Sequence, residues 1–190
     1  MGISNEKLLF TSFRKCPIAP VEGAPSYMLL NTPNSHFNAC ATSVHRNLGD
    51  GTLGYIVLTA PPATYNLLST ILFVVPVNVG PTIIITDPAT TAIVTLELVY
   101  NHAKKLWVWQ EYNNVDRAIK RVLKAIAPGV YFRTLRNRHT GYATVHSLGI
   151  LTHLHATYGM IKDEDTQAID MAVKKQINGE PHFEYFIDHI

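Results

Sequence analysis

The chain has 190 residues, of which 47% are hydrophobic and 16% charged, and this composition excludes a disordered protein and predicts a folded one. Its net charge of +2 at pH 7 is too small to indicate a partner by itself. The charges are segregated, however: residues 116–138 hold seven Lys or Arg and one acidic residue, whereas residues 162–190 hold seven acidic residues and three Lys.

The first predicted element is an irregular leader over residues 1–34, because four prolines interrupt it. A helix is expected from Ser35 to Leu48, since Ser35 can cap its first turn and apolar residues recur at helical spacing. Gly49-Asp50-Gly51 then marks a turn. The sequence therefore predicts a leader over residues 1–34 and one helical domain over residues 35–190.

Residues between this turn and position 86 carry mixed signals. The apolar piece 54–58 fits either a strand or a helical turn. Two adjacent prolines suit a helix start, so residues 63–71 are expected to be helical. The inward side of that helix is expected to hold Tyr65, Leu68 and Leu72. Residues 73–86 are rich in Val, Ile and Pro, which predicts an extended linker or an edge hairpin.

Residues 87–126 are predicted to form two consecutive helices. Asp87 can cap the first helix, and Pro88 fits its first turn. Its apolar stripe, which we expect other elements to cover, consists of Ile93, Leu96, Val99, Tyr100, Ala103, Leu106 and Trp107. After a break at Asn113-Asn114, the stripe of the second helix consists of Val115, Ile119, Val122, Leu123 and Ile126.

Ala127-Pro128-Gly129 is expected to end the second helix, because proline disfavours helical geometry in the residue before it. A short segment, residues 130–138, precedes a third helix from Val145 to Tyr158, which Gly159 would close in the left-handed conformation. The apolar side of this helix is expected to hold Leu148, Leu151, Leu154 and Tyr158.

Asp163 is predicted to cap a further helix near the C-terminus. The expected buried positions of that helix are Ile169, Val173 and Ile177. An apolar segment, residues 183–190, stops as its stripe is established, which suggests a truncated protein. Together the elements predict an all-α, multi-helix bundle with an irregular N-terminal leader, and one short hairpin if residues 73–86 pair.

Seven basic side chains form a predicted ridge along the second helix and the segment after it: Arg117, Lys120, Arg121, Lys124, Arg133, Arg136 and Arg138. Such a ridge could neutralise RNA phosphates, with an affinity that falls as salt rises. Two alternatives stay open. The ridge is either a solvated helix face, or it docks against the acidic C-terminal segment of the same or another copy.

Trp107 and Trp109 point to different faces of one helix, so only one of them is expected in the core. We expect Trp109 to be exposed and to act, with Tyr112, as an anchor for self-association. The reason is that an exposed tryptophan commonly fills a pocket of a partner.

No residue set indicates catalysis or metal binding. His153 and His155 point about 200° apart on a helix, while His146 and His153 lie two turns apart, too far for a shared zinc ion. Ser147 sits on no nucleophile elbow, and Asp163-Glu164-Asp165 are explained by helix capping. We therefore expect neither an enzyme nor a cofactor.

Cys16 and Cys40 lie far apart and no Asn-x-Ser/Thr acceptor occurs, which favours a reducing, cytoplasmic location over secretion. A single disulfide is the less favoured alternative. The longest apolar run, residues 71–85, is broken by prolines and a glycine, so no membrane span is expected.

The string Leu48-Gly49-Asp50-Gly51-Thr52-Leu53-Gly54-Tyr55 resembles the glycine-rich segment of Gag-like capsid proteins from copia-type LTR retrotransposons, particularly those of algae and related protists. Further segments of the chain resemble the same family. In chain order they are Gly23-Ala24-Pro25-Ser26-Tyr27, Trp109 with Tyr112, Asp116-Arg117-Ala118-Ile119, Leu135-Arg136-Asn137, Leu148 with Ile150-Leu151-Thr152-His153-Leu154, and Tyr158-Gly159. The similarity runs from about Gly23 to the end.

This resemblance implies a retroviral capsid-like bundle that self-associates and packages the RNA of its element. The zinc knuckle often found beyond such capsids is absent from the sequence, so RNA binding through a knuckle does not carry over. The expected function is a structural, homo-oligomeric capsid-like protein without a small-molecule substrate. The alternative is a nucleic-acid-binding helical module that acts through the basic ridge without assembly.

Overall fold

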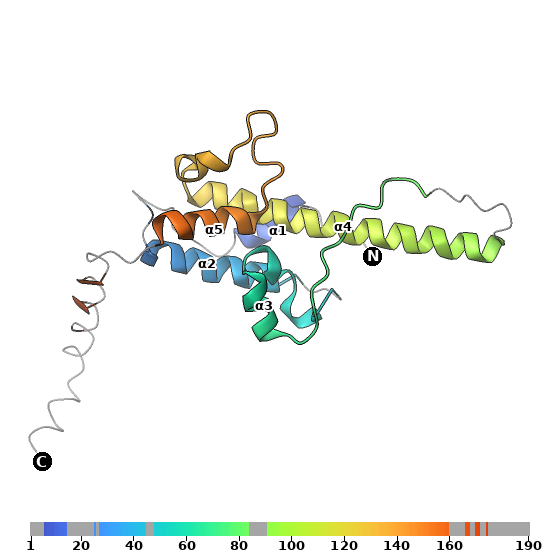
Figure 1. The fold of residues 1–190 in the computed structure, drawn as a ribbon, viewed down its shortest axis with the longest axis horizontal. Coiled ribbons are helices and arrows are strands. Elements are labelled where there is room, and N and C mark those ends of the chain that lie inside the picture. Colours follow the sequence, from blue (N-terminus) through green and yellow to red (C-terminus); the bar gives the residue numbers. More distant parts are fainter. Residues whose placement is uncertain are drawn as a thin grey trace, which may run out of the picture.

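A computed structural model of the chain describes residues 6–14, 25, 27–44, 48–83 and 91–159, together with 166, 167, 170, 171 and 174. The fold is all-α, as predicted, and no strand occurs in the described ranges. An isolated antiparallel bridge links Asn137 to Gly141. The elements are α1 (Glu6–Phe13), α2 (Tyr27–Thr42), the 3-10 turns η1 (Gly51–Leu53) and η2 (Ile56–Leu58), α3 (Pro62–Leu68), α4 (Ala92–Ile126), the 3-10 helix η3 (Gly129–Leu135) and α5 (Ser147–Tyr158) (Figure 1).

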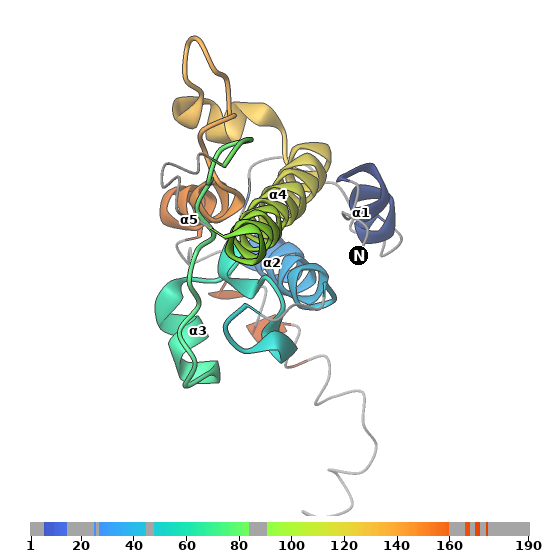
Figure 2. The ribbon, with the colours of Figure 1, turned by 90° about the vertical axis from the view of Figure 1, so that its right-hand side faces the viewer.

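The core lies where α2, the C-terminal half of α4 and α5 pack together, with η2 against α2 and α5. Seen along α4, the helices α1, α2 and α5 lie around it, with α1 along one side (Figure 2). The second predicted stripe of α4 is confirmed as core, because its residues Val115, Ile119, Val122, Leu123 and Ile126 are all buried. The core side chains of α5 are Ile150, Leu151 and Leu154.

The predicted irregular leader is wrong in its described part. Residues 6–13 form α1, and α2 begins at Tyr27, upstream of the start expected at Ser35. Ser35 therefore lies inside α2, where its hydroxyl donates to a backbone carbonyl one turn earlier. Pro33 is also inside α2 and is buried. Burial of one face of α2 in the core outweighs the unfavourable proline.

α4 is one helix of 35 residues, so the predicted break at Asn113-Asn114 is wrong. The side-chain amide of Asn113 donates to the Trp109 carbonyl oxygen 2.8 Å away, which satisfies this polar side chain within the helix. The helix begins after Thr91, whose hydroxyl accepts a hydrogen bond from a first-turn amide. The predicted start at Asp87-Pro88 lies outside the described residues.

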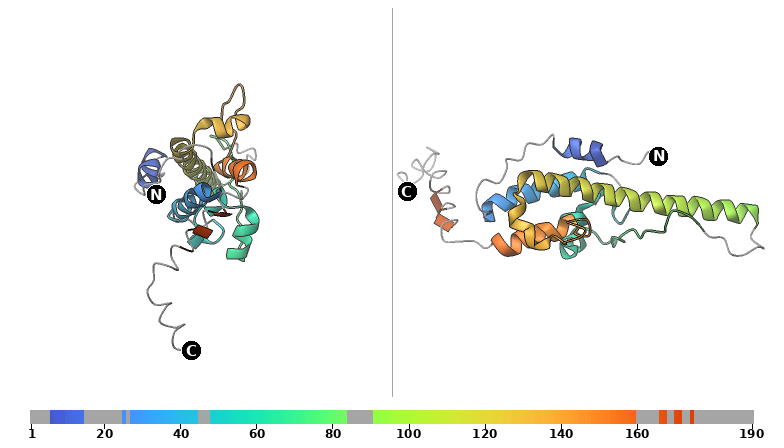
Figure 3. Two further views of the ribbon diagram at one scale, coloured as in Figure 1. Left: turned by 90° about the vertical axis from the view of Figure 1, so that its left-hand side faces the viewer. Right: turned by 90° about the horizontal axis from the view of Figure 1, so that it is seen from above.

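The two apolar stripes of α4 face different directions. At about 100° per residue, the stripe from Ile93 to Trp107 is centred roughly 130° away from the stripe that enters the core. The core covers only the second stripe, so the expected burial of the first is wrong: Ile93 is 79% exposed, Leu96 69% and Tyr100 68%. Residues 92–110, which we call the α4 arm, project from the body of the molecule (Figures 1 and 3).

The rest of the first stripe follows the same trend. Val99 and Ala103 are exposed, and Leu106 and Trp107, which lie closer to the body, are half-buried. The arm thus becomes progressively covered as it enters the bundle.

Two turns, α3 and an extended segment connect α2 to α4. The predicted helix over residues 63–71 is confirmed as the shorter α3, with Tyr65 buried. Leu68 and Leu72 are exposed, so their predicted inward orientation is wrong. Residues 69–83, which we call the strap, are extended without forming a strand, which favours a linker over a hairpin in this described part. The strap runs back toward the α4 arm (Figure 1).

The C-terminal elements largely follow the prediction. Ala127-Pro128-Gly129 ends α4, and α5 lies within the range predicted for the third helix. Gly159 has a φ of −83°, so the predicted left-handed closure is wrong. The five isolated described residues beyond it are helical, and Lys174 pairs with Asp170 at 2.6 Å.

The other C-terminal predictions fall outside the described residues. They are the Asp163 cap, the buried positions Ile169, Val173 and Ile177, and the segment 183–190. Within the part of the chain that is described, no helix combines the length and the apolar content needed to cross a lipid bilayer.

Candidate interaction surfaces

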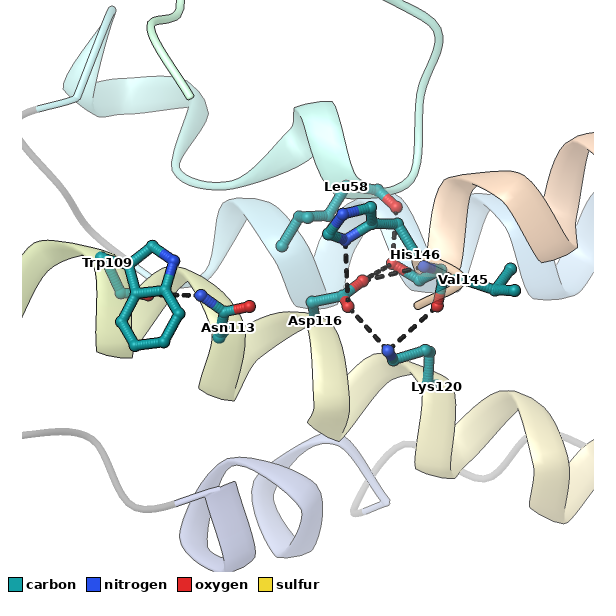
Figure 4. A network of polar contacts seen from close by, with 8 residues as sticks. Leu58, Trp109, Asn113, Asp116, Lys120, Val145 and His146 are labelled. Atoms are coloured by element: carbon teal, nitrogen blue, oxygen red, sulfur yellow. Dashed lines mark hydrogen bonds and ion pairs between the residues drawn. The ribbon is translucent and has the colours of Figure 1, made fainter. Parts of the chain in front are cut away.

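A cluster of buried polar side chains links α5 and η2 to α4 through hydrogen bonds. Asp116 on α4 (Figure 4) is 2% exposed. Its Oδ1 atom lies 2.8 Å from the backbone nitrogen of Ser147 and 2.7 Å from the Ser147 hydroxyl. The same hydroxyl lies 2.8 Å from the Leu58 carbonyl oxygen. A carboxylate on one helix thus accepts the first amide of another, where the helix dipole favours negative charge.

Lys120 completes this cluster from the same helix. Its Nζ atom lies 3.0 Å from Asp116 Oδ2 and 3.0 Å from the Val145 carbonyl oxygen, and the residue is only 8% exposed. His146 Nδ1 lies 3.3 Å from the same Oδ2 atom. The prediction that Lys120 belongs to an exposed basic ridge is therefore wrong. Its ammonium group neutralises a buried carboxylate one helical turn away.

We call Asp116, Lys120, His146 and Ser147 the Asp116 cluster. A catalytic relay needs an imidazole that contacts both the hydroxyl and the carboxylate. Here the hydroxyl and the imidazole each contact the carboxylate, and Ser147 is fully buried. The cluster therefore positions helices and presents no nucleophile at the surface.

Three cations of the predicted basic ridge gather on one side of α4. Arg117, Arg121 and Lys124 are exposed, and they line a groove of about 370 Å³ with Glu6 of α1 and Tyr142. The three side chains recur at helical spacing, so they share one face. We call this the basic groove. Its positive charge exceeds the single carboxylate that α1 contributes.

Aromatic rings pack against two of these cations. The guanidinium carbon of Arg121 lies 4.3 Å from the centre of the Phe10 ring, and Lys124 Nζ lies 4.7 Å from the centre of the Tyr142 ring. Partial burial lowers the pKa of Lys124, and the nearby positive charge of Lys120 lowers it further. These contacts orient both cations at the wall of the groove.

The remaining predicted ridge residues lie elsewhere. Arg133 on η3, and Arg136 and Arg138 after it, are exposed and do not line the basic groove. The predicted ridge thus divides into the basic groove, whose lining also includes the largely buried Lys120, and a separate group of arginines at η3. The prediction of a single ridge did not include this division, because helical spacing does not show which basic residue pairs with a buried carboxylate.

The predicted self-association anchor needs correction. Trp109 is half-buried rather than exposed. Tyr112 is buried in the core, where the centre of its ring lies 6.1 Å from that of Tyr55 and 6.2 Å from that of Phe73. Burial raises the pKa of Tyr112 to about 12, and the negative charge of Asp116 adds to this shift. Tyr112 is therefore a core residue and offers no side chain to a partner.

Exposed apolar side chains concentrate instead on two neighbouring segments. On the α4 arm they are Ile93, Val94, Leu96, Leu98, Val99 and Tyr100, and on α3 and the strap they are Leu67, Leu68, Ile71, Leu72, Val74, Val75 and Val77. A groove of about 550 Å³ lies between strap and arm, lined by residues 74–77 and 79 and by Asn101, Lys104, Lys105 and Val108. The Val-rich strap was the sequence signal for this surface.

The described histidines and cysteine do not assemble a metal site. Within the described ranges, no three His, Cys, Asp or Glu side chains gather closely enough to hold an ion. His153 Nε2 lies 3.3 Å from the Thr134 hydroxyl, and burial lowers the pKa of His155. Cys40 is buried near His36, whereas Cys16 lies outside the described residues.

No protein-family model matches this chain, and no curated protein or solved structure is significantly similar to it. The resemblance to Gag-like capsid proteins therefore stays a prediction from sequence.

Proposed function

We propose that this chain is a structural, capsid-like protein that associates with copies of itself through the α4 arm. One observation carries the proposal: the first apolar stripe of α4 projects from the bundle and stays exposed along the arm. Soluble monomers rarely expose large contiguous apolar patches, and such patches mark interaction sites. Burying one large apolar side chain contributes about 1.5–3 kcal/mol.

The arm is favoured over the rest of the surface for two reasons. It is a continuous helix, and an amphipathic helix that lacks a partner can bury its stripe against another helix. The resemblance to Gag-like capsid proteins, which self-associate, supports the same function class. The resemblance itself is part of the proposal.

Replacing Leu96 and Tyr100 together with glutamate is expected to weaken self-association at least about 100-fold, because two apolar side chains lose their burial. Sedimentation velocity over a range of concentrations measures the association constant. Helicity should stay unchanged, since both side chains are exposed in the monomer.

The matched control is Val130→Glu, which adds the same charge at an exposed apolar residue of η3, away from the arm. It should associate like the unaltered chain. A chain that sediments as a monomer at high protein concentration and at several salt concentrations would contradict the proposal.

A second candidate function is nucleic-acid binding at the basic groove. It is favoured by the convergence of Arg117, Arg121 and Lys124 on one face of α4, with the ring of Tyr142 at the groove wall. Cations at this spacing can neutralise successive phosphates, and such binding weakens steeply as salt rises. In a capsid-like protein this would be the surface that contacts packaged RNA.

The double variant Arg121→Glu/Lys124→Glu is expected to weaken binding of single-stranded RNA at least about tenfold at low salt. Each contact between a cation and a phosphate releases a counterion from the RNA, which favours binding, and the variant loses these contacts. Fluorescence anisotropy with a labelled oligonucleotide measures the affinity. The control Arg133→Glu/Arg136→Glu changes the net charge equally outside the groove. If both variants lose affinity equally, the groove is not the binding site.

A further inference from the structure

The α4 arm has the spacing of a helix that pairs with another helix. Five of its apolar residues recur in alternating steps of three and four, as in a coiled-coil seam. The members of this seam are Ile93, Leu96, Tyr100, Ala103 and Trp107. Only the last is half-buried, and the others are exposed, so a second helix can reach the seam. The arm projects beyond the body (Figure 3), and the strap lies beside it near Asn101, Lys104, Lys105 and Val108.

The charges beside the seam are unequally distributed. Glu97 and Lys104 are seven residues apart, so they lie on the same flank of the seam, within about 20° of each other. Both side chains are exposed, and no ion pair among the described residues involves either. The opposite flank, at Val99 and Leu106, carries no carboxylate, lysine or arginine. One flank thus holds two unpaired charges of opposite sign.

This asymmetry selects an orientation. When two identical helices pair in parallel, the charged flank of each faces the uncharged flank of the other. When they pair antiparallel, like flanks meet, so Glu97 of each copy comes beside Lys104 of the other. A two-fold axis then generates the same ion pair twice. Charges that flank an apolar seam commonly set partner choice and orientation in this way.

We propose that the partner of the α4 arm is the same arm of a second copy, aligned antiparallel. This inference rests on the proposed self-association and adds its geometry. The seam aligns Tyr100 with Ala103 of the other copy, a large residue against a small one, and Leu96 with Trp107. The overlap of residues 92–110 is about 27 Å long. The two-fold axis crosses near Asn101 and His102.

Charge exchange tests the orientation. Glu97→Lys and Lys104→Glu, each alone, are expected to weaken the homodimer roughly tenfold at low salt, because two attractive pairs become two repulsive ones. Mixing the two single variants should restore association as a heterodimer. The double variant Glu97→Lys/Lys104→Glu should restore the homodimer. Sedimentation equilibrium of the full chain measures all four constants, and circular dichroism checks that each variant is folded.

The outcomes separate the two proposals. If Leu96→Glu/Tyr100→Glu abolishes a dimer that neither charge variant changes, self-association through the arm stands and the antiparallel arrangement is overturned. If the dimer survives Leu96→Glu/Tyr100→Glu, the interface lies elsewhere and both proposals fail. Restoration in the mixture and in the double variant supports the antiparallel pair, because parallel arms would not bring these side chains together.

Discussion

Replacing Asp116 with alanine is expected to lower the free energy of unfolding by about 3–5 kcal/mol, the usual effect of removing one partner from a buried ion pair. The Asp116 carboxylate accepts from the amide and the hydroxyl of Ser147 and pairs with Lys120. Its loss would leave a buried ammonium group without its counter-charge. It would also leave the first turn of α5 without the acceptor that α4 supplies.

Urea denaturation followed by circular dichroism measures this effect. The matched control is Arg117→Ala, next in sequence but exposed, which should change stability by no more than about 0.5 kcal/mol. In the double variant Asp116→Ala/Lys120→Met, part of the loss should be recovered, since the uncompensated charge is gone. Equal stability of Asp116→Ala and Arg117→Ala would show that the cluster does not fasten α5.

Gly54→Ala is expected to destabilise the chain by at least about 3 kcal/mol, because strain and a clash act together. Gly54 has φ 52° and ψ −124°, a conformation that side chains rarely allow. An added Cβ would also lie 2.7 Å from the carbonyl oxygens of Ala41 and Val44 and 2.9 Å from that of Thr42. These are backbone atoms at the end of α2, so they cannot move aside without displacing the helix.

Substitutions at two other glycines separate the effect of backbone strain from the effect of the steric clash. At Gly129 an added Cβ meets nothing within 4 Å and the backbone imposes no positive φ, so Gly129→Ala should be nearly neutral. Gly80 has φ 79° in open space, so Gly80→Ala should cost only the strain, about 1 kcal/mol. Chemical denaturation of the three variants gives the comparison. A Gly54→Ala variant no less stable than Gly80→Ala would mean that α2 does not approach this turn so closely.

The glycine-rich segment illustrates what sequence resemblance can and cannot reveal. The string from Leu48 to Tyr55 predicted a turn and supported the comparison with Gag-like capsids. Its structural reason is visible only in three dimensions, because the Tyr55 amide donates to the Ala41 carbonyl and Gly54 lies against the end of α2. The residues that require this glycine are more than nine positions away in the sequence.

Helical periodicity correctly predicted the all-α class and the buried stripe from Val115 to Ile126, and Pro128 correctly predicted that α4 ends just before it. These features depend on local geometry, since a 3.6-residue period and a proline act within one or two turns. The irregular leader was predicted from the frequency of prolines, which reports only on local backbone preference, and that prediction was wrong. The tertiary burial that stabilises α2 around Pro33 is not local.

The sequence by itself determined which residues of this protein form apolar stripes, but only the tertiary structure decided which stripe the core covers. A helical pattern of apolar residues indicates that one face is to be buried. It does not indicate whether the same chain or another copy covers that face. The two stripes of α4 point in different directions, and one small bundle can enclose only one of them. Likewise, the sequence marked Lys120 as basic, and the approach of α5 to Asp116 decided that its charge would be buried.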